Sequence, residues 1–146
     1  MSFRSLIFPL TLLIASLPLQ AEQYQDFDNY RVHYNAFNSD MLAPEVAKAH
    51  SLSRSSYEAV INITVQKKNA SGGFDPVKAK VEGKASDIYS SVRKLKMKEV
   101  TEGSAVYYLA ELPITDGQKL TFDIQVVPQG EKRSYPLNFS QQFFVK

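Results

Sequence analysis

Apolar and polar residues alternate along most of the chain beyond residue 29, and this two-residue period restricts the fold more than any other feature. In the clearest case, apolar side chains at every second position from Leu120 to Val126 are separated by Thr121, Asp123 and Gln125. Side chains of a β-strand point alternately to opposite faces, so this spacing predicts a strand with one buried and one solvated face. The same period recurs over residues 30–37, 57–66, 77–82, 94–98, 106–112 and 137–145.

Turn-forming residues separate these segments, notably at 69–73, 102–103, 113–117 and 128–133. About seven short strands joined by such turns predict an all-β fold, an immunoglobulin-like β-sandwich of antiparallel strands. A proline fits the first position of a helix and an acidic residue its first turn, so Pro44 and Glu45 predict one short helix. A helix of about two turns is not stable alone. We therefore expect residues 38–50 to form a cap docked on one end of the sandwich.

The first 21 residues have the features of a signal peptide. Arg4 gives a positive start, residues 6–17 are almost wholly apolar, and Ala21 is a small residue of the kind signal peptidase requires. The apolar run is shorter than the roughly 20 residues that span a bilayer, so no stable membrane anchor is expected. We predict export to the periplasm, cleavage after Ala21 and a single domain over residues 22–146.

Composition excludes several kinds of chemistry. The chain has no cysteine, which rules out disulfides, thiol nucleophiles, Cys-ligated zinc and iron–sulfur clusters. Its 17 lysines and arginines nearly balance 15 acidic residues, so nucleic acid is not an expected partner. Only two histidines are available for acid–base chemistry near neutral pH. No cofactor is expected.

A family resemblance rests on the block Val-His-Tyr-Asn-Ala-Phe at residues 32–37, with residues 44–49, 105–111 and 122–126. These segments resemble a family of small exported proteins of Gram-negative bacteria that is known only as a domain of unknown function. The resemblance covers nearly the whole chain after the signal peptide. It implies a periplasmic β-sandwich and supplies no activity.

His33 is the first candidate for a functional side chain, because Arg31 and Asn35 share its face of the predicted strand. These residues could form a binding or proton-transfer site if a carboxylate such as Asp28 lies nearby. Alternatively, His33 is a partly buried histidine whose ring nitrogens bond the backbone of the loop at 38–44. We expect this structural role.

Two pairs of adjacent aromatic residues must each send one ring to either face of a strand. Tyr108 and Phe143 fit the apolar faces, so Tyr107 and Phe144 are predicted to point outward. An exposed aromatic ring can mark a surface that contacts a partner.

Imidazole and thioether groups suit copper, and His33, His50, Met41 and Met97 could supply them. None of these residues has a local ligand spacing such as His-x-His, and alternation with Leu95 places Met97 in the core. We therefore predict no metal site.

Three lysines, Lys94, Lys96 and Lys98, fall on one face of a predicted strand with Arg93 beside them. They could bind an anionic polymer, lipid head group or acidic protein. We expect instead a solvated face, or an edge strand on which lysine prevents unwanted pairing.

Because the chain has few residues suited to catalysis, we favour a non-enzymatic periplasmic binding or accessory module. Its ligand would be an unknown protein or small molecule. The candidate binding residues are Arg31, His33, Asn35 and Tyr107. A hydrolase-like enzyme centred on His33 and a copper carrier are the alternatives.

Overall fold

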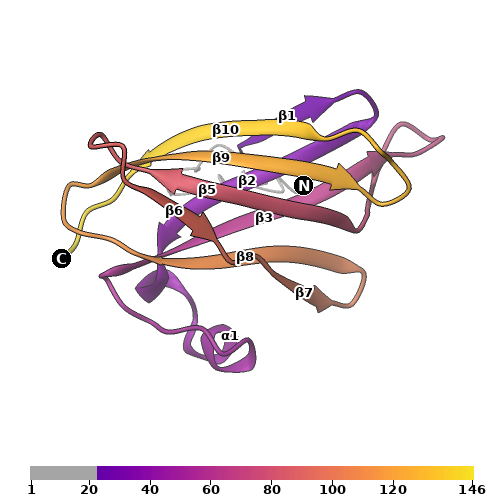
Figure 1. Ribbon diagram of the computed structural model, residues 1–146. Helices are drawn as coiled ribbons and strands as arrows, with labels where there is room; N and C mark the ends of the chain where they lie inside the picture. Colours follow the sequence, from indigo (N-terminus) through magenta and orange to yellow (C-terminus); the bar gives the residue numbers. More distant parts are fainter. Residues whose placement is uncertain (1–22) are drawn as a thin grey trace, which may run out of the picture.

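The computed structural model describes residues 23–146, which form two facing antiparallel β-sheets with one short helix outside them (Figure 1). Sheet A has the order β1-β2-β3-β8-β7 with β4 beside β3, and sheet B has the order β10-β9-β5-β6. The elements are β1 (Tyr24–Phe27), β2 (Tyr30–Asn38), η1 (Ser39–Met41), α1 (Pro44–Ala49), β3 (Glu58–Lys68), β4 (Phe74–Pro76), β5 (Ala79–Ser86), β6 (Val92–Leu95), β7 (Lys98–Glu102), β8 (Ala105–Pro113), β9 (Lys119–Pro128) and β10 (Tyr135–Gln142). The predicted signal peptide lies outside the described residues.

The prediction of an all-β sandwich is confirmed, with ten strands in place of about seven. Two additional strands, β1 and β4, are short pieces that pair with β2 and β3. The third arises because the segment expected as one strand over 94–98 is divided between β6 and β7, which belong to different sheets.

The prediction of one lysine-bearing strand face is therefore wrong. Lys94 lies on β6 of sheet B and Lys98 on β7 of sheet A, while Lys96 lies in the connection between them. The chain changes sheets at this point, and Met97 packs against the core. The three exposed ammonium groups thus do not form one strip.

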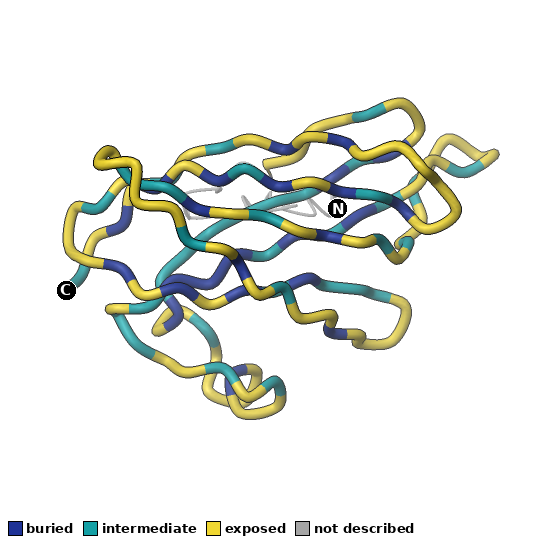
Figure 2. Tube along the Cα trace, viewed as in Figure 1, coloured by how far each residue is buried: buried dark blue, intermediate teal, exposed yellow. Residues whose placement is uncertain are grey.

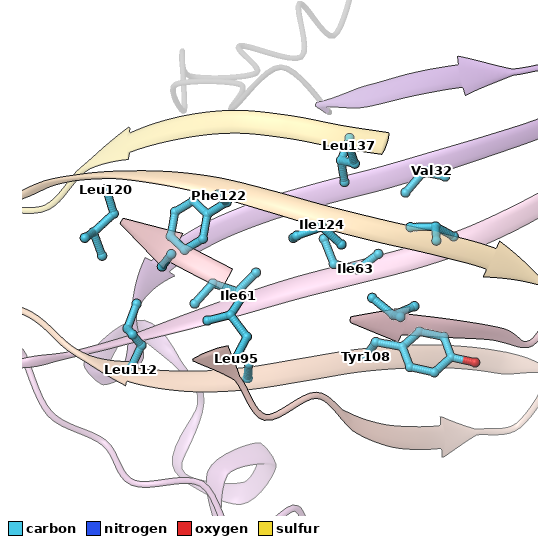
Figure 3. Close-up of a cluster of buried hydrophobic side chains, with 14 of the residues drawn as sticks. Val32, Ile61, Ile63, Leu95, Tyr108, Leu112, Leu120, Phe122, Ile124 and Leu137 are labelled. Atoms are coloured by element: carbon cyan, nitrogen blue, oxygen red, sulfur yellow. The ribbon is translucent and has the colours of Figure 1, made fainter. Parts of the chain in front are cut away.

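The core fills the space between the sheets. Figure 3 shows Ile61 and Ile63 of sheet A facing Phe122 and Ile124 of sheet B, and all four are fully buried. Buried and exposed residues alternate along the strands in Figure 2, as the two-residue period predicts.

Each of the two aromatic pairs divides as expected between the inside and the outside. Tyr108 and Phe143 lie in the core, whereas Phe144 is 61% exposed and Tyr107 lies on the outer face of sheet A.

Two tyrosine hydroxyls join the sheets at one end. Tyr30 of β2 donates a hydrogen bond to Glu131 in the β9–β10 turn, and Tyr135 of β10 donates to Asp28 in the β1–β2 turn. Burial, together with the bond to Glu131, raises the pKa of Tyr30 to about 12. The bond to Asp28 raises the pKa of Tyr135. Both hydroxyls thus remain protonated donors over a wide pH range.

The predicted cap is present, but it covers the outer face of sheet A rather than the end of the sandwich. Val60 of β3 points away from the core and is nevertheless fully buried, because the segment around α1 lies over it. Ala47 of α1 is buried and Leu42 is half-buried. Two other apolar residues of this segment remain open to solvent, since Met41 is 67% exposed and Val46 is 40% exposed. Only a narrow part of the surface of α1, at Ala47, is thus buried against the rest of the protein.

Candidate binding site on the outer face of sheet A

The antiparallel register of β2 and β3 places polar residues opposite one another on the face of sheet A that points away from the core. Arg31 lies opposite Gln66, His33 opposite Thr64 and Asn35 opposite Asn62. Directly opposed residues share a face and have neighbouring side chains. Two strands distant in sequence therefore build one polar surface.

A recess in this surface contains all four candidate residues predicted from the sequence, contributed by β2 and β8. We call it the polar recess. It is lined by Gln23, Arg31, His33, Tyr34, Asn35, Asn62, Thr64, Gln66, Tyr107 and Gln141. Tyr34 stacks on Phe139 on the core side of β2, and Gln141 belongs to β10 of sheet B, so the recess extends beyond the outer face of sheet A.

The contributions of Asn62, Thr64 and Gln66 could not be assigned from the sequence. Alternation put them on the polar face of their strand, but only the pairing of β3 with β2 brings them beside His33. The alternating pattern showed that both segments have a polar face. It did not show that these two strands are neighbours in the sheet.

His33 is held by a neighbouring amide. Its Nε2 lies 2.8 Å from Oε1 of Gln66, and its ring centre lies 5.7 Å from that of Tyr24. The expected bond to the backbone of the loop at 38–44 is therefore wrong, because the ring bonds a side chain of the neighbouring strand β3. A hydrogen bond to an amide oxygen requires the protonated nitrogen of the ring as donor.

The carboxylate suggested for a proton-transfer pair is engaged elsewhere. Asp28 accepts hydrogen bonds from the Tyr135 hydroxyl at 2.7 Å and from Arg133 at 3.3 Å. The hypothetical pair of His33 and Asp28 is thus not formed.

Arg31 is fixed at the rim of the polar recess. Its guanidinium carbon lies 4.1 Å from the ring centre of Tyr24 and 4.3 Å from that of Phe74, and its nitrogens bond both carboxylate oxygens of Asp26. The hydrogen bonds from Arg31 lower the pKa of Asp26. Two rings and a bidentate carboxylate therefore set the plane of this guanidinium.

Asn62 carries a buried acceptor that no donor satisfies. Its Oδ1 is the only buried side-chain polar atom without a hydrogen-bond partner among residues 23–146. Leaving such a group unpaired costs roughly 1–3 kcal/mol. This atom is therefore a position where a donor from outside the chain would be stabilised.

A second cavity of about 200 Å³ lies between the cap and sheet A, and we call it the cap cavity. Apolar side chains from both sides form most of its wall. It is lined by Phe37, Leu42, Val46, His50, Leu52, Val60, Asn62, Val100, Glu102, Tyr107 and Leu109. Asn62 and Tyr107 also line the polar recess, so the two hollows adjoin at these residues.

Polar contacts attach the cap to β7 beside this cavity. His50 Nε2 lies 2.7 Å from Oε1 of Glu102, and the Lys98 ammonium donates to the His50 carbonyl at 3.0 Å. These two contacts hold the C-terminal end of α1 against the edge strand of sheet A.

The possible metal ligands are dispersed. His33 lines the polar recess and His50 the cap cavity, while Met97 packs against the core. Within residues 23–146, no three His, Asp or Glu side chains gather in a way that could hold a metal ion. In the same part of the chain, no helix is long and apolar enough to cross a bilayer.

Fold and site together define a small β-sandwich protein with a polar recess on the outer face of one sheet. Residues 24–146 match the model of DUF4426, a domain of unknown function, and the chain belongs to this family. The predicted membership of an uncharacterised family is thereby confirmed. A search of curated proteins found no match.

The crystal structure of a DUF4426 family protein from Pseudomonas aeruginosa PAO1 is similar to this chain, with 38% sequence identity and a TM-score of 0.76. The similarity covers 88% of this chain and 98% of that one. The two proteins therefore share their fold over almost the whole described region.

Copper-bound FetP, a variant from uropathogenic Escherichia coli strain F11, has a TM-score of 0.59 at 6% identity, covering 86% of this chain and 97% of that one. A second FetP structure of the same strain has a TM-score of 0.50 at 10% identity, with 84% and 91% covered. At such low identity, these similarities show a shared fold alone.

Proposed function

We propose that the protein is a non-enzymatic binding module of the periplasm, with its ligand on the outer face of sheet A. The observation that carries this proposal is the polar recess, where strands from distant parts of the chain converge with Asn62 Oδ1 left unpaired. Concave sites with a few convergent polar groups are the usual positions of ligands.

The chemistry of the recess indicates a ligand with hydroxyl or amide groups. Asn35, Thr64 and Gln66 offer neutral donors and acceptors, and Tyr107 adds an aromatic ring. The nearby Arg31 is already paired with Asp26, so its charge is compensated. A neutral polar ligand therefore matches the surface better than a strongly anionic one.

Binding is favoured over catalysis because of the partner of His33. In a Ser-His-Asp triad a carboxylate orients the histidine ring, whereas His33 contacts the amide oxygen of Gln66. Turnover of a model ester that is lost in His33→Ala would support the alternative, a hydrolase-like enzyme.

Copper carriage is the other alternative. FetP, which shares the fold, is described as copper-bound. The dispersal of His33, His50 and Met97 argues against an equivalent site in this chain. Tight, stoichiometric copper binding by the purified chain would favour the alternative.

The proposal is tested with the side-chain amides of the recess as reporters. We expect the Asn35 and Gln66 amide signals of the ¹⁵N-labelled protein to shift on titration with N-acetylglucosamine or N-acetylalanine methylamide. Asn138, exposed on β10 of sheet B, is the matched internal control. Gln66→Leu should reduce the response while Asn138→Leu leaves it unchanged. Signals that stay in place, or that shift equally at Asn138, would contradict the proposal.

A further inference from the structure

We infer that the ligand is amphipathic, with a short acyl chain in the cap cavity and an amide N–H that donates to Asn62 Oδ1. This inference rests on the proposed function and specifies the class of ligand for the same face. The ligand's polar head group would lie in the polar recess, beside Thr64 and Gln66.

The first step is the contrast between the two adjoining hollows. The polar recess is lined mainly by amide, hydroxyl, imidazole and guanidinium groups, whereas Phe37, Val60 and Leu109 contribute apolar wall to the cap cavity. One molecule that occupies both must therefore be polar at one end and apolar at the other.

The second step is the position of the unpaired acceptor. Asn62 lines both hollows, and its register partners are Asn35 on one side and Leu109 on the other. Its Oδ1 therefore lies at the change from polar to apolar surface. An amide that joins an acyl chain to a polar head places its N–H donor at the same junction.

The third step is size. A cavity of about 200 Å³ holds roughly six water-sized groups at about 30 Å³ each. An acyl chain of about six carbons therefore fills it, and a longer chain would have to leave the cavity or displace the cap. Each methylene that enters should strengthen binding about fourfold.

The test is a calorimetric titration of the full chain, purified after export, with acetyl-, butanoyl-, hexanoyl- and decanoylglycinamide. We expect Kd to fall about fourfold for each methylene from acetyl to hexanoyl. From hexanoyl to decanoyl the gain should become much smaller, because the cavity is full. A constant Kd, a steady gain through decanoyl, or no binding by any member would overturn the inference.

A variant in which a larger side chain fills the cap cavity, compared with a matched control, gives a second test. Val46 lies on the cap and lines the cavity, whereas Met41 lies on the cap outside the lining residues and is 67% exposed. In Val46→Trp, hexanoylglycinamide should bind no more tightly than acetylglycinamide does, while Met41→Trp should behave like the wild type. An undiminished chain-length effect in a folded Val46→Trp would also overturn the inference.

Failure of this inference is distinguishable from failure of the proposed function. If Asn35 and Gln66 respond to the sugar or peptide probe but chain length has no effect, the ligand is purely polar. In that case, the proposed function stands and the amphipathic ligand is rejected. If chain length matters and the recess amides never respond, the proposed site is wrong and the head group does not lie there.

Discussion

At the scale of single residues, one polar atom on the outer face of sheet A lacks a hydrogen-bond partner, whereas two polar side chains on the same face have partners. Arg31 has two rings and a carboxylate, and His33 has an amide partner. Asn62 Oδ1 is buried without a donor. A buried unpaired polar group lowers stability. The free protein thus carries a cost at the position where we place the ligand.

Asn62→Leu should therefore stabilise the free protein while it abolishes binding of hexanoylglycinamide. Removal of the unpaired acceptor should raise the free energy of unfolding by about 1 kcal/mol in urea melts. Asn138→Leu, on an exposed strand face, serves as the control and should not be stabilising. A less stable Asn62→Leu would show that the amide has a partner in the folded protein.

Tyr30 should control part of the loss of stability at alkaline pH. Its pKa is raised in the fold from 10.0 to about 12, so between these values the unfolded state loses a proton that the folded state keeps. The free energy of unfolding therefore falls as pH rises through this range. Tyr30→Phe should give a shallower decline, and Tyr89→Phe, at an 84% exposed position, an unchanged one. Identical slopes for the wild type and Tyr30→Phe would contradict this account.

At the scale of elements, the pairing of β2 with β3 creates the polar recess, and the cap closes the apolar hollow beside it. Hydrophobic periodicity predicted most strands and their buried faces, because alternation depends only on local sequence. It could not predict that Gln66 lies beside His33, since pairing between strands is set by the whole sheet. Nor did it predict the sheet change at Lys96, because alternation continues through the crossover.

The cap was predicted because a helix of about two turns is not stable alone, but which of its apolar residues are covered depends on the surface beneath. Leu42 faces Val60 across the cap cavity and is half-buried, so Leu42→Ala should lower the free energy of unfolding by about 1–2 kcal/mol. Met41→Ala, at a 67% exposed position, should change it by less than about 0.5 kcal/mol. Urea melts measure both, and equal midpoints for the two variants would mean that the cap is not docked.

At the scale of the whole molecule, a two-sheet sandwich leaves the outer face of each sheet available. Lys84 and Asp123 make an exposed ion pair on sheet B, where most outer residues of β9 and β10 are polar. Sheet A differs because the cap covers part of its outer face and leaves a recess beside the covered part. The asymmetry between the two sheets is thus the structural basis of the proposed function.

Export belongs to this scale as well. We expect the chain recovered from the periplasm to begin at Glu22, because Ala21 supplies the small residue before the predicted cleavage site. Intact mass spectrometry measures the start of the chain directly. A different first residue would move the cleavage site, and recovery of the uncleaved chain from the membrane fraction would reject the prediction of export.

The most direct test of the central claim is to identify what the protein carries when it is isolated from the periplasm. The native protein is purified and then denatured, and the small molecules that it releases are analysed by mass spectrometry. The wild type, Asn62→Leu and the control Asn138→Leu are compared. The account predicts a stoichiometric neutral compound with an amide and a short acyl chain, present in the wild type and Asn138→Leu and absent from Asn62→Leu. A compound retained equally by Asn62→Leu would contradict the assignment of the ligand to the outer face of sheet A.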